Sequence, residues 1–233
     1  DNLKVALKNE QFFSSKLFVC DEVHGFGSKK LRSVLEGKIK KIKFRLGLSA
    51  TPERSYDEIG NQFIESEIGP TIYRYTLKDA IMGGILCEFE YIPLTYNFSL
   101  EDKKKTKIAY SRYNTRKKSG LKENETKIQL YMDLADVRKL SKNKLPIFEN
   151  FIKNNTKNLK NCLIFVETME YGKLIQDIII HYDIDYHTYY ADDEKQNLKK
   201  FANGEFDLLI TCKKLSQGID INSVQNIILF SCS

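Results

Sequence analysis

Short, largely apolar runs that end in polar or charged residues constrain the fold of this chain more than any other feature. Two of these runs lie early in the chain, at residues 17–20 and 44–48. Four lie later, at residues 162–166, 186–190, 206–211 and 224–230. Runs of this length suit strands that are buried on both faces of a parallel sheet. Helix-like segments separate the later runs, and this alternation is typical of parallel α/β sheets with right-handed crossovers. The sequence therefore predicts an α/β fold with two parallel-sheet domains.

The segments between these runs carry apolar residues at helical spacing. We expect helices at residues 29–39, 77–82, 145–153, 168–181 and 194–202. Residues 64–75 are predicted to form a loop with a short extended segment, since Gly69 and Pro70 interrupt them. Residues 89–98 alternate weakly between apolar and polar side chains, which favours a strand.

A stretch of different composition, residues 101–140, lies between the two sets of runs. Tyr110 and Tyr113 alternate there with a basic group, Lys103, Lys104, Lys105, Lys107, Arg112, Arg116, Lys117 and Lys118. Leu130, Leu134 and Val137 follow at helical spacing. We predict a helical insertion or hairpin that projects from the sheet domains. A solvated, charged helix pair is the plainer interpretation, and charge runs in general are more often of that kind.

Charge and cysteine usage narrow the functional classes. The 37 lysines and arginines exceed the 31 acidic residues by enough to give a formal net charge of +6, which favours an acidic partner, with nucleic acid as the leading candidate. Five scattered cysteines without a CxxC pair, and only three histidines, argue against a zinc site or disulfide framework. They favour reduced thiols in a cytoplasmic protein. No apolar run has the length of a membrane span.

The first apolar run leads directly into Asp21, Glu22, Val23 and His24. Ligands of α/β sheets bind at the carboxyl ends of the strands, where this tetrapeptide lies. Asp21 can hold Mg²⁺ through water, and Glu22 can polarise an attacking water in phosphoryl transfer. A divalent cation would also relieve the repulsion between the two carboxylates. An acidic strand cap paired with lysine is the alternative, which the motifs further along the chain disfavour.

Hydroxyl residues follow the second run, and a further group begins at the last residue of the fifth run. Ser49 and Thr51 can hydrogen-bond His24 or the carboxylates, which would link nucleotide state to domain movement. The later group comprises Thr211, Lys213, Gly218 and Asp220. The hydroxyl and ammonium of the first two could hold a nucleic-acid phosphate, glycine permits close backbone approach, and the carboxylate can accept hydrogen bonds from ribose. An ordinary loop with a glycine cap would also account for this second group.

In order, these segments resemble the motifs of superfamily 2 helicases and translocases, which have two RecA-like lobes. The DEVH tetrapeptide matches motif II, the DEAD/DEAH box, and residues 49–51 match motif III. Residues 162–168 resemble motif IV, and residues 211–220 match motif V. The resemblance points to the XPB-like DNA repair helicases, which are related to restriction-enzyme motors, through RLGLSATPER and through residues 68–86 and 201–221. It covers most of the chain.

The resemblance implies roles for these residues in an ATP-dependent DNA helicase or translocase. Asp21 would bind Mg²⁺ through water, Glu22 would activate the hydrolytic water, and His24 with Ser49 and Thr51 would couple hydrolysis to motion. Gly218 and Asp220 would touch ATP from the second lobe. The implied nucleic-acid contacts are Thr211, Lys213, Arg54, Lys103, Lys104, Lys105, Arg112, Arg116 and Lys117. The basic insertion takes the place of the family's thumb-like element, which grips DNA.

The family pattern also predicts the domain limits. Residues 1–79 would be the later half of RecA-like lobe 1, and residues 80–233 lobe 2 with the thumb-like insertion at about 100–140. No GxxxxGK[ST] loop occurs in these 233 residues, and the arginine-rich motif VI is absent. We therefore expect a fragment, with both lobes incomplete, that does not hydrolyse ATP by itself. Of the Arg-Glu-Asp motif of XPB-like proteins only Arg54 is in place, followed by Ser55, Tyr56 and Asp57.

Other functions share parts of this pattern. A motor subunit of a restriction system would use the same engine, and an RNA helicase is a further possibility that the basic insertion disfavours. A non-catalytic nucleic-acid-binding module would have no use for both Asp21 and Glu22. Protein partners in a repair or restriction complex fit the motor interpretations.

Overall fold

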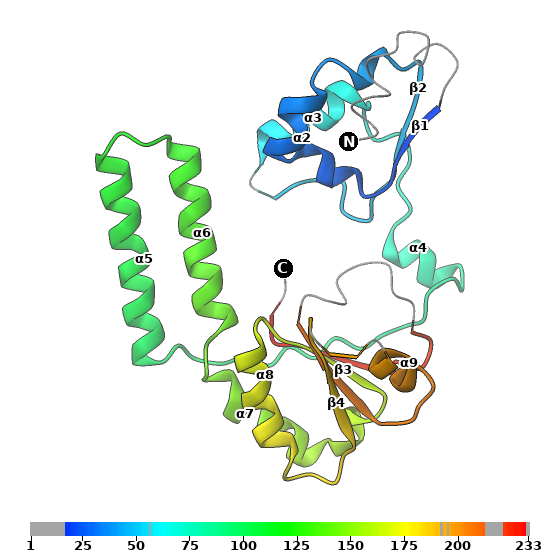
Figure 1. The fold of residues 1–233 in the computed structure, drawn as a ribbon, viewed down its shortest axis with the longest axis vertical. Helices are drawn as coiled ribbons and strands as arrows, with labels where there is room; N and C mark the ends of the chain where they lie inside the picture. The colour runs from blue at the N-terminus through cyan, green and yellow to red at the C-terminus, as the bar shows by residue number, and fades with distance from the viewer. Residues whose placement is uncertain (1–16, 56, 192, 195, 213–220, 232–233) are drawn as a thin grey trace. The chain divides into compact units, whose positions relative to one another are not determined.

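The computed structural model describes residues 17–55, 57–191, 193–194, 196–212 and 221–231. Within them the chain forms two compact units, residues 1–90 and residues 91–233 (Figure 1). The predicted lobe boundary after residue 79 lies inside the first unit, and the division of the parent protein into lobes stays a prediction.

The first unit contains a parallel pair of strands covered by helices. β1 (Leu17–Cys20) pairs with β2 (Phe44–Gly47), with Leu17 opposite Phe44 and Cys20 opposite Gly47. The described helical elements are η2 (Val23–Gly27), α2 (Lys29–Leu35), η3 (Ile39–Lys41), α3 (Glu58–Glu67) and α4 (Leu77–Met82). One core cluster consists of Leu35, Ile39, Ile42 and Phe63, and a second consists of Cys20, Val23 and Ile64. The second cluster includes the last residue of β1 and packs it against α3.

A buried carboxylate fixes the connection between α2 and β2. Glu67, at the end of α3, is 1% exposed and accepts three backbone hydrogen bonds. The donors are the N–H groups of Gly37 at 2.6 Å, Ile39 at 2.9 Å and Lys40 at 3.1 Å. A buried charge is tolerated only when its hydrogen bonds are made, and here the backbone makes them.

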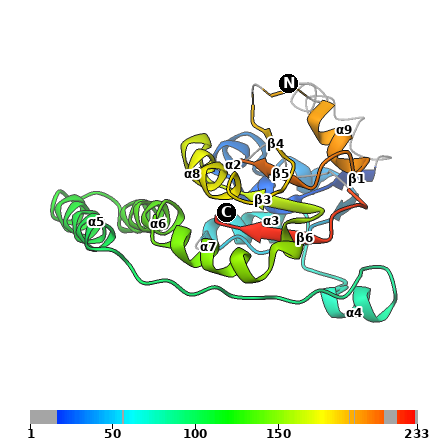
Figure 2. The ribbon, with the colours of Figure 1, turned by 90° about the horizontal axis from the view of Figure 1, so that it is seen from below.

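The second unit is a sheet with helices on both faces. Its four described strands are all parallel, in the order β4-β5-β3-β6. They are β3 (Cys162–Phe165), β4 (Tyr186–Tyr189), β5 (Leu208–Thr211) and β6 (Asn226–Leu229). The described helical elements around them are α7 (Lys144–Asn154), η4 (Thr156–Leu159), α8 (Met169–Ile179) and α9 (Gln196–Ala202). Figures 1 and 2 show α7 and α8 on one face and α9 on the other.

Two apolar clusters match this arrangement. Ile164 and Ile210 face Phe148 of α7 and Ile175 of α8, while Leu163 and Leu209 belong to the cluster of Phe201 in α9. The predicted α/β class with parallel sheets is therefore confirmed. Among the helices that the structure describes, none is long and apolar enough to cross a membrane.

The predicted insertion is a hairpin of two antiparallel helices, α5 (Leu100–Lys118) and α6 (Glu123–Lys139), that projects from its unit (Figure 1). Its base is fastened by buried polar groups. Ser141 donates its hydroxyl proton to Asp102 Oδ2 at 2.7 Å, and the Tyr171 hydroxyl of α8 donates to the Ser141 carbonyl at 2.7 Å. A capping box between Ser99 and Asp102 starts α5.

Three local predictions were wrong. The loop predicted from residue 64 is helical to Glu67, because Asp57 caps α3 and Phe63, Ile64 and Glu67 are buried. Residues 89–98, all of them described, contain no strand, since no neighbouring strand pairs with them and Phe89 and Tyr91 are exposed. The helix predicted at residues 29–39 ends at Leu35, because the chain turns at Gly37, whose φ is +72°.

Replacing the buried carboxylate tests this account of the first unit. We expect Glu67→Ala to lower the free energy of unfolding by about 2–4 kcal/mol, because three backbone donors lose their acceptor. Urea denaturation of the chain measures it. Glu65→Ala, on the exposed side of the same helix, is the matched control and should change stability by no more than about 0.5 kcal/mol. Equal effects of the two substitutions would contradict the role assigned to Glu67.

Candidate active site

The DEVH tetrapeptide forms a tight turn at the carboxyl end of β1. Val23 is buried and its N–H donates to the Leu48 carbonyl at 2.9 Å, while the Leu48 N–H donates to the Cys20 carbonyl at 2.8 Å. Glu22 adopts the left-handed conformation, with φ 50° and ψ 50°. Such a conformation is uncommon for a residue other than glycine and persists where the surroundings enforce it. The turn therefore has an enforced shape, held between β1 and the residue after β2.

Both carboxylates of the turn are accessible. Asp21 and Glu22 are exposed, and Asp21 Oδ1 accepts the Glu22 N–H at 2.9 Å. No group of three or more acidic, histidine or cysteine side chains that could hold a metal ion occurs among the described residues. Mg²⁺ suits such a pair, because it keeps several waters and is bound by one or two carboxylates together with substrate phosphates. The residues present therefore fit a nucleotide-bound Mg²⁺.

His24 lies between the acidic turn and the residues after β2. Its Nδ1 is 2.9 Å from Ser49 Oγ and 3.2 Å from Glu22 Oε2. Ser49 Oγ also accepts the backbone N–H of Thr51 at 3.1 Å. The structure thus brings together Glu22, His24 and Ser49, as the sequence predicts, and includes Thr51 through its backbone. A shift of one of these groups would therefore change the hydrogen bonds of the others.

Arg54 is part of the same neighbourhood. Its Nη1 donates to the His24 carbonyl at 2.7 Å, and its Nε donates to Asp57 Oδ2 at 2.8 Å. Asp57 Oδ1 accepts from Arg32 Nη1 of α2 at 3.0 Å and from the Gly60 N–H at 2.9 Å. Partial burial raises the pKa of Asp57, but the hydrogen bonds from Arg54, Gly60 and Arg32 outweigh it and hold that pKa below its ordinary value. The carboxylate is therefore charged at neutral pH.

The basic residues of the hairpin are concentrated on one helix. α5 carries eight lysines and arginines and two acidic residues, whereas α6 carries three basic and four acidic residues. Lys103, Lys104 and Arg112 are exposed, as are Lys105 and Lys117. Arg116 is different, because it faces α6 and its Nη1 lies 3.6 Å from Asp133 Oδ2. Lys105 pairs with Glu101 at 2.7 Å.

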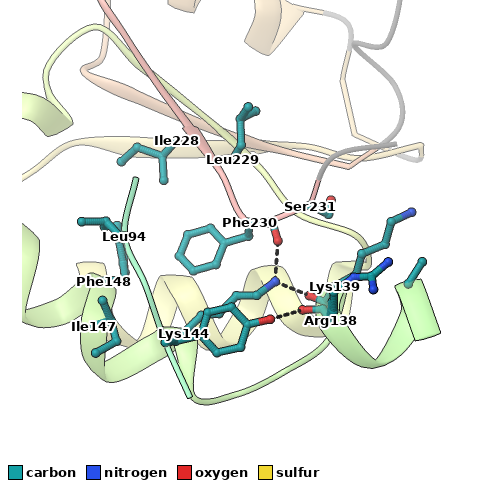
Figure 3. Close-up of a pocket in the computed structure, with 12 residues that line it drawn as sticks. Leu94, Arg138, Lys139, Lys144, Ile147, Phe148, Ile228, Leu229, Phe230 and Ser231 are labelled. Atoms are coloured by element: carbon teal, nitrogen blue, oxygen red, sulfur yellow. Dashed lines mark hydrogen bonds between the residues drawn. The ribbon is translucent and has the colours of Figure 1, made fainter. Parts of the chain in front are cut away.

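A cavity of about 330 Å³ lies in the second unit, where the end of α6, the start of α7 and the end of β6 meet (Figure 3). Lys144 Nζ points across it and donates to the carbonyls of Phe230 at 2.6 Å and Lys139 at 3.1 Å. The Tyr96 hydroxyl donates to the Arg138 carbonyl at 3.1 Å. The two Lys144 bonds join the base of the hairpin to the residue that follows β6, and the Tyr96 bond ties the segment before α5 to the end of α6.

Comparison with known proteins identifies the arrangement. Residues 2–54 match the family model described as "Type III restriction enzyme, res subunit", and residues 140–233 match "Helicase conserved C-terminal domain". The first model contains the DEVH turn with Ser49 and Thr51, and the second contains the four-stranded sheet. This is the order of the two lobes of superfamily 2 enzymes. The two matches together cover 147 of the 233 residues and support a superfamily 2 helicase or translocase.

A curated relative and two solved structures are similar to this chain. The DNA 3'-5' translocase XPB2 of Sulfurisphaera tokodaii is 24% identical over 225 residues, which are 88% of this chain and 49% of the relative. The chain thus spans about half the length of the curated relative. The Pyrococcus furiosus Hef helicase domain is 12% identical, with a TM-score of 0.47 over 98% of this chain and 68% of that one. The Sulfolobus solfataricus SWI2/SNF2 ATPase core in complex with dsDNA is 16% identical, with a TM-score of 0.46 over 97% of this chain and 60% of that one.

The segment that the sequence predicts to be motif V, residues 211–220, is described in part. Thr211, at its start, is fully buried, and its hydroxyl donates to the Tyr189 carbonyl at 2.8 Å. In this structure its side chain therefore offers no surface to a nucleic acid. Lys213, Gly218 and Asp220 lie outside the described residues, and their roles stay predictions.

Sequence interpretation missed several residues of the motif II neighbourhood. Asp57 accepts hydrogen bonds from both Arg54 and Arg32, and Asn61 binds the Arg54 backbone. Asp57 could have been found, because an aspartate three residues before Gly60 at the start of a helical pattern is typical of an N-cap. Nothing in the sequence signals that Arg32 reaches it.

Proposed function

We propose that this chain is the central part of an ATP-dependent DNA helicase or translocase, with motifs II and III in residues 1–79 and motifs IV and V in residues 80–233. The observation that supports it best is the cluster of Glu22, His24 and Ser49 at adjacent strand ends, with His24 Nδ1 within 3.2 Å of both other side chains. Such a cluster joins a candidate general base to a residue on the neighbouring strand end.

The chain's own residues would act as follows. Asp21 would bind a Mg²⁺-nucleotide through water, and the ion would supply charge neutralisation at the phosphates. Glu22, half-exposed and free of a lysine or arginine ion pair among the described residues, would orient and deprotonate the attacking water. His24 would couple a change in the position or protonation of Glu22 to Ser49 and, through Ser49, to the backbone of Thr51. Gly218 and Asp220 would contact ATP from the other lobe.

We propose DNA as the nucleic acid that this protein binds, because α5 is rich in basic residues. Its exposed basic residues suit the phosphate backbone, which carries no base information, so the grip would be independent of sequence. The relative is named a DNA 3'-5' translocase, and we propose the same substrate class here. Lys213 and the exposed basic residues of α5 would make these contacts. A cytoplasmic location and protein partners in a repair complex would accompany this role.

A restriction-system motor is the second candidate, because the family model over residues 2–54 carries the description of a restriction-enzyme subunit. Such a protein would combine the same ATP-driven motor with a nuclease. Cleaved DNA that appears together with ATP turnover would distinguish it from a helicase or translocase without nuclease activity.

Replacing the candidate general base tests the proposal. In the protein as its gene encodes it, we expect duplex or single-stranded DNA to stimulate ATP turnover more than RNA does. Glu22→Gln should lower kcat by at least about 10²-fold, since it removes the base but keeps the shape of the side chain. Phosphate release measures it. Glu65→Gln, exposed on α3, is the matched control. Turnover that survives Glu22→Gln would contradict the proposal.

Neutralising one face of α5 tests the DNA contact. Lys103, Lys104 and Lys107 are exposed and lie on one side of the helix. We expect their replacement by glutamine to weaken DNA binding and to reduce the slope of log K against log salt by about 0.9 per lost phosphate contact. Fluorescence anisotropy at several salt concentrations measures both.

The matched control replaces three exposed lysines outside the hairpin, Lys153, Lys157 and Lys160. Equal losses of affinity in the two triple variants would show that net charge, and not α5, governs binding.

A further inference from the structure

A bridge of charged side chains connects the motif II turn to the beginning of α3. Arg54 donates to the His24 carbonyl at 2.7 Å with Nη1 and to Asp57 Oδ2 at 2.8 Å with Nε. The guanidinium thus makes two hydrogen bonds in different directions from one rigid plane. The ammonium of a lysine has a single nitrogen and could not occupy both donor positions.

Both ends of the bridge are anchored. The Arg54 N–H donates to Asn61 Oδ1 at 2.8 Å, and Asn61 Nδ2 donates back to the Arg54 carbonyl at 3.1 Å. Asp57 is held by the Gly60 N–H and by Arg32. The Arg54 guanidinium therefore has little freedom, and the His24 carbonyl is bound to a fixed point of α3.

Two glycines leave the space that the bridge occupies. A Cβ on Gly27 would lie 2.4 Å from Arg54 Cδ and 2.8 Å from the Gly60 carbonyl oxygen. A Cβ on Gly60 would lie 2.6 Å from Asp57 Oδ2 and 2.8 Å from Arg54 Nε. These distances are shorter than real Cβ contacts, so any larger residue would displace the bridge or the backbone around it.

The position of Glu22 depends on this turn. Glu22 is in the left-handed conformation without a side-chain cap, and its carbonyl accepts the Gly25 N–H at 2.9 Å. The His24 carbonyl lies inside the short segment that this bond closes. A conformation of this kind persists only where its surroundings enforce it, and Arg54 is one of the groups that does so.

We propose that Arg54 and Asp57 are positioning residues that hold the motif II turn, so that the Glu22 carboxylate and the His24 ring stay aligned for hydrolysis. This inference rests on the proposed function. It also gives Arg54 a different task from the nucleic-acid contact that the family resemblance implies. The guanidinium is already committed to the turn and to Asp57.

The test compares conservative variants in the protein as its gene encodes it. We expect Arg54→Lys and Asp57→Asn each to lower the kcat of DNA-stimulated ATP turnover by roughly 10- to 100-fold, the loss expected from a misplaced catalytic group. The KM for ATP, the Kd for DNA and its salt slope should change by less than about twofold, since neither charge contacts a ligand. The double variant should lose little more than either single variant, because both remove the same bridge.

Two controls separate positioning from folding. Arg74→Lys changes an exposed arginine that pairs with Glu53 at the surface, and it should leave kcat unchanged. Asp57→Asn keeps a good N-cap for α3, so the protein should stay folded at the assay temperature, although its Tm falls because the carboxylate's bonds to two arginines are weakened. A kcat defect in a protein that is still folded, with unchanged KM and Kd, is a result that a purely structural role would not produce.

Either of two results would overturn the inference. Full kcat in Arg54→Lys, with weaker DNA binding and a smaller salt slope in Arg54→Ala, would make Arg54 a phosphate contact. Full kcat in Asp57→Asn would show that the bridge is not needed. Glu22→Gln separates these failures from that of the proposed function: if it also keeps its turnover, the proposed active site is wrong, and if it alone loses turnover, only the positioning role fails.

Discussion

The candidate site depends on the parallel pairing of β1 with β2. Cys20 lies opposite Gly47, and the bonds from Leu48 to Cys20 and from Val23 to Leu48 extend the ladder past both strands. Because the strands are parallel, the chain leaves both at the same edge of the sheet. The acidic turn after β1 and the hydroxyl residues after β2 therefore lie next to each other, and the 2.9 Å contact between His24 and Ser49 is a consequence.

In the second unit, a charged helical hairpin is attached to a parallel sheet. α5 carries the charge, while the base of the hairpin is fixed by buried polar contacts. Burial raises the pKa of Asp102, but hydrogen bonds from Ser141 and Ser99 lower it further than burial raises it. Lys144 adds a bond to the last residues of the β6 region through the Phe230 carbonyl. Under the proposed function, force on α5 would reach the sheet of its own unit through these groups.

Periodicity and motif order predict the six described strands, the hairpin and the cluster of Glu22, His24 and Ser49, because each of these follows from local pattern or from a parallel register, although the strand predicted at residues 89–98 is absent. The remaining features depend on contacts between distant residues. Glu67 binds backbone groups about thirty positions away, and Arg54 reaches the carbonyl of His24. A sequence shows an arginine near a motif but not the direction of its guanidinium. Nor does the sequence show that the Thr211 hydroxyl is buried in the sheet, where it donates to the Tyr189 carbonyl.

The central claim, that this chain is part of a motor driven by ATP along DNA, is tested most directly by movement. The measurement is displacement of a fluorescent oligonucleotide by the protein as its gene encodes it, from DNA that carries the oligonucleotide as a third strand or as a paired strand. The account predicts displacement that requires ATP and is lost in Glu22→Gln. Tight DNA binding without displacement from either substrate, at any ATP concentration, would contradict it.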